Sequence, residues 1–118
     1  MAITRTYTYV GELKGAGQPP YNVYEGVYAF EAADLYDRDA RPALVFAGLT
    51  AVVGMMGVIG FAFAASNLGY PAVPLPPSGR TVTFIVLESG TAAAGLDEKT
   101  DNEAYGVDGA IRCTVFGI

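Results

Sequence analysis

The feature that most constrains this chain is an uncharged segment that runs from Pro42 to Gly79. Its first part, residues 43–65, reads ALVFAGLTAVVGMMGVIGFAFAA and has Thr50 as its only hydroxyl-bearing residue. Removing apolar surface from water is favourable roughly in proportion to the area removed. We therefore expect most of this segment to be covered by a protein core, a subunit interface or a lipid bilayer.

One interpretation of residues 43–65 is a transmembrane helix. Their length is sufficient, because about 20 apolar residues span a bilayer. Small residues at four-residue spacing (Ala43, Ala47 and Ala51) would also suit close packing of helices in lipid. Under this interpretation the protein is a small integral membrane subunit with a single span at 43–65.

The other interpretation is a series of short buried strands. Four glycines interrupt the segment (Gly48, Gly54, Gly57 and Gly60), and each costs about 1 kcal/mol in a water-soluble helix. The many valines, with Ile59, Phe61 and Phe63, favour strands, and the glycines would mark turns or bulges. The flanking segments resemble strands of one sheet system, which a membrane-spanning helix would divide, so we favour the strands.

Four further segments have the β-branched and aromatic residues of strands: residues 3–10, 21–30, 81–87 and 110–118. Five tyrosines occur between Tyr7 and Tyr28, and we expect them to pack across neighbouring strands. The predicted fold is mainly β: a small β-sandwich or barrel-like domain with extended arms. We expect at most one or two short helices, one of them between Leu96 and Tyr105. A chain of 118 residues forms a single domain, residues 1–118.

Residues 66–79 form a proline-rich segment within that domain. Its prolines (Pro71, Pro74, Pro76 and Pro77) favour an extended backbone without regular hydrogen bonds. Because the segment is also uncharged, we expect an extended arm that lies on a neighbouring surface.

The charge of the chain is low and negative. Charged residues make up 16% of it and the net charge is −5, so the chain has few charges to cover its surface. This favours assembly with a neighbouring protein. The seven basic residues are scattered, whereas nucleic-acid binding requires a clustered positive face, so no nucleic-acid partner is expected.

Residues for common catalytic chemistry are missing. The chain has no histidine, which removes the commonest general base and the commonest zinc ligand. Cys113 lies in an apolar run and is interpreted as a buried small hydrophobic residue. The carboxylates from Glu31 to Arg41 lack the spacing of a calcium loop, and we interpret that segment as a solvated loop that neutralises its own charge. We expect neither a cofactor nor an enzyme activity.

In general character the chain resembles the small decoration or cement proteins of tailed-bacteriophage capsids. Those proteins are short, β-rich and without a leader, and they hold neighbouring coat subunits with extended arms; the N-terminus here also lacks the apolar segment of a signal peptide. The resemblance implies a virion protein, assembled in the host cytoplasm, that stabilises the particle. Its partners would be itself, as a homo-oligomer such as a trimer, and a major capsid protein. A soluble module that binds a hydrophobic or proline-recognising partner is a third hypothesis, beside the membrane subunit.

The residues predicted to form the interface lie in the uncharged segment and are large and apolar. They are Val45, Phe46, Val52, Val53, Ile59, Phe61, Phe63, Tyr70, Val73 and Leu75.

Overall fold

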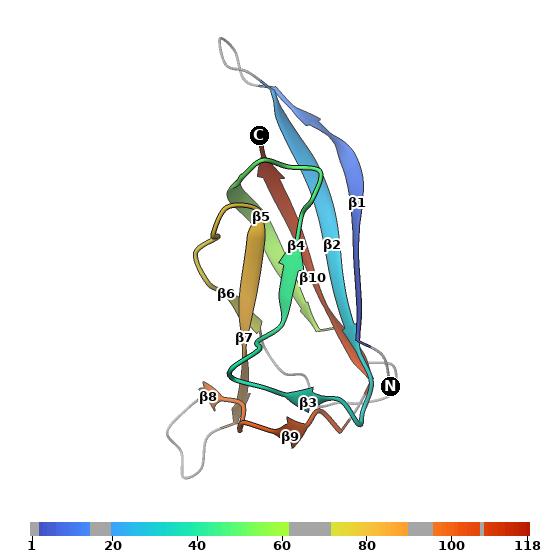
Figure 1. Cartoon of the computed structure of the whole chain (residues 1–118), viewed down its shortest axis with the longest axis vertical. Coiled ribbons are helices and arrows are strands. Elements are labelled where there is room, and N and C mark those ends of the chain that lie inside the picture. Colours follow the sequence, from blue (N-terminus) through green and yellow to red (C-terminus); the bar gives the residue numbers. More distant parts are fainter. Residues whose placement is uncertain (1–2, 15–19, 62–71, 90–95, 107) are drawn as a thin grey trace.

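The computed structural model describes residues 3–14, 20–61, 72–89, 96–106 and 108–118. Two antiparallel sheets pack face to face, which confirms the predicted mainly β fold (Figure 1). The first sheet has the order β1 (Thr4–Leu13), β2 (Tyr21–Phe30), β10 (Gly109–Gly117), β5 (Val52–Phe61). The second contains β4 (Ala43–Val45), β7 (Thr81–Ser89) and β6 (Ala72–Pro74), with β8 (Leu96–Glu98) also paired to β7. A two-stranded ribbon of β3 (Leu35–Tyr36) and β9 (Glu103–Ala104) lies at the end that carries β8.

The four segments predicted as strands outside the uncharged segment correspond to β1, β2, β7 and β10. The expected helix between Leu96 and Tyr105 was wrong, because these residues form β8, a turn and β9 instead. The turn contains Asn102 with a positive φ of 60°, and β8 is held by its ladder with β7. Tertiary pairing thus overrides the weak local preference for a helix. The described residues contain no helix.

The described part of residues 43–65, which ends at Phe61, forms strands joined by a turn. β4 ends at Val45, a turn follows at Ala47 and Gly48, and β5 begins at Val52. The pairing of β5 with β10 has three register shifts, which agrees with the expectation that glycines mark bulges here. Within the described ranges, no helix is long and apolar enough to cross a membrane.

The core lies between the two sheets. The first sheet contributes Tyr28, Phe30, Ile111, Cys113 and Val115, and the second contributes Leu44, Val82, Phe84 and Val86. The two sheets approach closely at Gly26, where an added Cβ would lie 2.7 Å from Phe46 Cζ and 2.8 Å from Leu44 Cδ1. A larger residue at this position of β2 would therefore force the side chains of the facing sheet, or the backbone, to move.

Residues 66–79 were expected to form an extended arm on a neighbouring surface. The described part of the segment begins with β6, which pairs with β7 of its own chain through Val73 and Ile85. Leu75 N–H continues this pairing by donating to Thr83 O at 2.8 Å. Residues 66–71 lie outside the described part of the chain. Residues 72–75 are therefore extended, but they form the edge of the second sheet.

Candidate interaction surface

The most exposed element of the sandwich is β1, at one edge of the first sheet. Figure 1 shows it along the outer side of the molecule, where β2 is its only partner among the described strands. Every residue of β1 is exposed apart from Gly11, which is half-buried. The exposed fraction is 43% for Tyr7, 51% for Tyr9 and 62% for Val10, which are high values for large apolar side chains. β1 therefore presents an open sheet edge together with apolar surface.

A bulge at Val10 determines which side chains of β1 lie on the same face. The ladder with β2 pairs Tyr9 with Tyr24 and then Gly11 with Val23, so Val10 is an extra residue without an opposite partner. Before the bulge, Arg5 is opposite Tyr28; after it, Glu12 is opposite Asn22.

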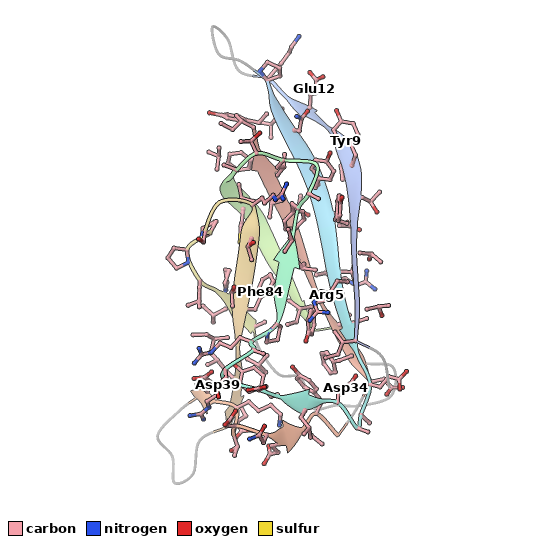
Figure 2. All side chains as sticks on the ribbon, viewed as in Figure 1. Arg5, Tyr9, Glu12, Asp34, Asp39 and Phe84 are labelled. Carbon is pink, nitrogen blue, oxygen red and sulfur yellow. The ribbon has the colours of Figure 1, made fainter. Side chains whose placement is uncertain are left out.

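Residues that face each other across an antiparallel ladder lie on the same side of the sheet, and alternate residues of one strand do so too. Asn22, Tyr24 and Tyr28 of β2 therefore share a face. The bulge thus places Glu12 on the face that already carries Arg5, Tyr7 and Tyr9, although the numbering alone would place it on the other. Figure 2 shows Arg5, Tyr9 and Glu12 in this order along β1.

Aromatic side chains form a continuous cluster on this face. The Tyr24 ring centroid lies 5.7 Å from that of Tyr7 and 5.4 Å from that of Tyr9. Phe46 joins the cluster from the second sheet, with its centroid 6.1 Å from that of Tyr7. The expected packing of tyrosines across neighbouring strands is confirmed at these positions. The cluster is covered on the Phe46 side and open on the β1 side.

The charged residues at the two ends of β1 have no ion-pair partner among the described residues. Arg5 instead lies over an aromatic ring, with Cζ 5.2 Å from the Tyr28 centroid. Glu12 is exposed near the opposite end of the strand. The edge strand therefore carries one positive and one negative side chain on one face, with two half-exposed tyrosines between them.

The residues predicted to form the interface fall into three groups. Val45, Val53 and Val73 are half-exposed and Leu75 is partly buried, so they are accessible. Phe46 and Val52 belong to the core between the sheets, where the chain itself covers them, so they are not available to a partner. The side chains of Ile59 and Phe61 are outside the described part of the chain, as are Phe63 and Tyr70.

The sequence prediction missed β1 as a surface. The pattern of residues 3–10 correctly indicated a strand, and its tyrosines suggested a half-buried one. The composition of residues 3–10 does not distinguish an edge strand from a central one, because that depends on which strand lies beside it. The glutamate that follows Gly11 was a usable signal, since a charge beside a strand glycine is typical of an exposed, bulged edge.

A second cluster of polar side chains lies at the end of the molecule that carries β8. There, Phe84 N–H of β7 donates to Pro42 O, and Val86 O accepts from Lys99 N–H, so β4 and β8 follow one another along one edge of β7. The Tyr36 hydroxyl lies between them and accepts a hydrogen bond from Val86 N–H at 3.3 Å. The hydroxyl thus accepts from a backbone N–H of β7 at the point where the pairing with β4 has ended and that with β8 begins.

Glu98 is the centre of this cluster. It accepts hydrogen bonds from Tyr36 Oη at 2.6 Å and from Arg41, Nε to Oε2 at 2.8 Å and Nη2 to Oε1 at 3.1 Å. The two-point contact with Arg41 is the main reason that the pKa of Glu98 is lowered to about 2. Arg38 also lies near it, with Nε 3.8 Å from Glu98 Oε1. The expectation that residues 31–41 neutralise their own charge was wrong for these arginines, which pair with β8 instead.

Lys99 is the buried charge of the same region. Its side chain is fully buried, with Nζ 2.6 Å from Glu103 Oε1 and 3.5 Å from Glu88 Oε1. Lys99 lowers the pKa of the Glu103 carboxyl, chiefly through their hydrogen bond. Every buried side-chain nitrogen and oxygen atom of the described residues has a hydrogen-bond partner. The cluster is thus an internally satisfied connection between β3, β7, β8 and β9.

Neither cluster contains an arrangement for metal binding or thiol chemistry. Across the described ranges, no group of three or more His, Cys, Asp or Glu residues could hold a metal ion. Cys113 is fully buried, as interpreted from the sequence, and burial raises the pKa of its thiol to about 11. A thiol in this state is a poor nucleophile at neutral pH.

Comparisons with known proteins add no relative. No protein-family model matches the sequence, and no curated protein or solved structure matches the chain significantly. The open edge of β1 is therefore the best-supported candidate site, on geometry alone.

Proposed function

We propose that the protein is a non-enzymatic structural protein that assembles with itself and, in a virion, on or between capsid subunits, where it stabilises the particle. The observation that carries this proposal is the exposure of β1 on both of its faces. An open strand edge presents unpaired backbone N–H and C=O groups, which readily pair with a strand of another chain.

The distribution of apolar surface supports assembly. Large apolar side chains are exposed along several edges of the sandwich, among them Tyr9 and Val10 on β1, Val45 on β4 and Val73 on β6. A chain with only 16% charged residues has few charges to keep such edges apart in water. Contacts at more than one edge would allow one molecule to hold two neighbours.

The capsid role rests on the resemblance to decoration proteins in size and β-rich character. A sandwich with extents of 51 × 31 × 26 Å and open edges is suited to bridging adjacent subunits of a shell. In this role the partners are other copies of the chain and a major capsid protein, and the location is the virion.

Native mass measurement in detergent-free buffer tests self-assembly. The expected result is a defined multiple of the 12.3 kDa chain at micromolar concentration. A single species of 12.3 kDa over the whole range would overturn the self-assembly part of the proposal.

The capsid part has a separate test. Purified particles made by a genome that encodes this chain should contain it in a fixed ratio to the coat protein, as measured by quantitative mass spectrometry. Absence of the chain from such particles would contradict a virion role while leaving self-assembly intact.

A further inference from the structure

We infer that β1 pairs with β1 of a second copy, antiparallel and about a two-fold axis at Thr8, so that the two first sheets form one continuous sheet. This inference rests on the proposed self-assembly and names its surface and its register. The strand order across the joined sheet is β5–β10–β2–β1 followed by β1–β2–β10–β5 of the second copy. Such a contact is isologous, because each copy uses the same surface.

The register follows from the bulge. When two copies of one strand pair antiparallel, the side chains of opposite residues must lie on the same face of the joined sheet. With Thr8 on the axis, Tyr7 of one copy is opposite Tyr9 of the other, and Arg5 is opposite Glu12. Both pairs satisfy the face requirement, because the extra residue Val10 places Glu12 on the face of Arg5.

Charge complementarity favours this register, and it favours a second copy of the chain as the partner of β1. Each copy has one positive and one negative side chain on the interacting face of β1, at equal numbers of ladder positions from Thr8. The antiparallel arrangement therefore forms two Arg5–Glu12 pairs between copies. A parallel arrangement in register would instead place like charges side by side, which disfavours cross-strand pairing.

The side chains between the charges are also self-complementary. Tyr7 and Tyr9 are both half-exposed and already contact Tyr24 in each copy. In the ladder between the two β1 strands, Tyr7 of one copy faces Tyr9 of the other. These pairs join the aromatic clusters of the two sandwiches. Aromatic pairs across strands add stability beyond the area that they bury.

A bulge commonly protects a sheet edge from pairing, because the extra residue twists the strand. Here the bulge lies away from the axis, and the run from Thr4 to Tyr9 is regular. In the ladder between the two copies, each Val10 lies next to a Tyr7–Tyr9 pair and has no residue opposite it. Val10 has the same position in the existing ladder between β1 and β2. The bulge limits the pairing to one register rather than preventing it.

Reversal of the two charges, singly and together, tests the register. The measurement is the dimer dissociation constant, obtained by sedimentation velocity. E12R places a second arginine opposite Arg5, and R5E places a second glutamate opposite Glu12, so each single variant should weaken the dimer about tenfold. The double variant R5E/E12R restores opposite charges and should return the constant close to that of the wild type. Failure of the double variant to recover would overturn the inference.

Thr8→Lys tests the axis, because it brings two ammonium groups face to face at the centre of the contact. We expect loss of the dimer and faster hydrogen exchange of the β1 amides, which the ladder between copies would protect. The control is Thr50→Lys, the same change at an exposed residue outside β1, which should leave both readouts unchanged. Circular dichroism of each variant checks that the sandwich is folded.

The outcomes separate this inference from the proposed function. A wild-type oligomer that withstands Thr8→Lys and both charge reversals would show that another surface is used, which overturns the β1 pairing and leaves self-assembly standing. A wild-type monomer would overturn both.

Discussion

The Tyr36 hydroxyl donates a hydrogen bond of 2.6 Å to Glu98 Oε2, although the two residues are 62 positions apart in the chain. The same hydroxyl accepts from Val86 N–H, so one oxygen atom connects β3 and β8 to β7. This is the point at which β7 exchanges β4 for β8 as its neighbour. At this end of the sandwich a side-chain hydroxyl joins the strands, whereas elsewhere backbone hydrogen bonds join them.

Tyr36→Phe should destabilise the protein by about 1–3 kcal/mol, because it leaves Val86 N–H buried without an acceptor. The measurement is the free energy of unfolding from urea titration at fixed protein concentration, since assembly would otherwise alter it. Tyr9→Phe is the matched control: Tyr9 is half-exposed, and its substitution should change the free energy by less than about 0.5 kcal/mol. Equal effects of the two substitutions would contradict the bridging role of Tyr36.

The lowered pKa of Glu98 predicts a dependence of stability on pH. In the folded protein Arg41 and Tyr36 hold the pKa at about 2, against an ordinary value of 4.5. The unfolded chain then binds the proton more readily, so the stabilisation by Glu98 is complete above about pH 4.5 and is lost as the pH falls through about 2.

Glu98→Gln isolates this contribution. The variant should be less stable than the wild type at pH 7, because an amide cannot replace the charged two-point contact with Arg41. The two proteins should approach equal stability as the pH falls below about 2, where Glu98 becomes protonated in the folded as well as in the unfolded chain. Urea midpoints measured across this pH range provide the test, and a constant difference would show that ionisation of Glu98 does not matter.

Strand positions were predictable from the sequence to the extent that local composition determines them. The segment 21–30 is rich in valine and aromatic residues, which favour strands, and β2 has the predicted bounds Tyr21–Phe30. The glycines of residues 43–65 correctly indicated strands with irregular register, because their cost in a helix outweighed the apolar length.

What could not be predicted depends on pairings between distant residues. Phe46 looked like an interface residue because its surroundings are apolar, yet it packs against Gly26 and Tyr7 of its own chain. Arg41 was expected to pair within its own loop, but it pairs with Glu98 of β8, whose Oε2 lies 2.8 Å from Arg41 Nε. The exposure of β1 has the same origin, since edge and central strands can have the same composition.

Cys113 should resist thiol reagents in the folded protein. Its side chain is fully buried in β10, and burial raises its pKa to about 11, so little thiolate is present at pH 8. Labelling with a coloured aromatic disulfide should be slow in buffer and complete within the mixing time in concentrated urea. Fast stoichiometric labelling of the folded chain would show that the centre of the first sheet opens readily.

Gly26→Ala tests the close approach of the two sheets at this position. The added methyl group would lie 2.7 Å from Phe46 Cζ, so the ring or the backbone must move. Overpacking of this kind costs about 1–3 kcal/mol. The ring edge is one of two obstructions, because Leu44 Cδ1 would lie 2.8 Å from the same methyl group. Phe46→Leu should therefore relieve part of the overlap, and the double variant G26A/F46L should be more stable than the sum of the two single effects predicts. Urea unfolding of the four proteins gives the coupling free energy, and strict additivity would show that the sheets accommodate the methyl group without contact between Gly26 and Phe46.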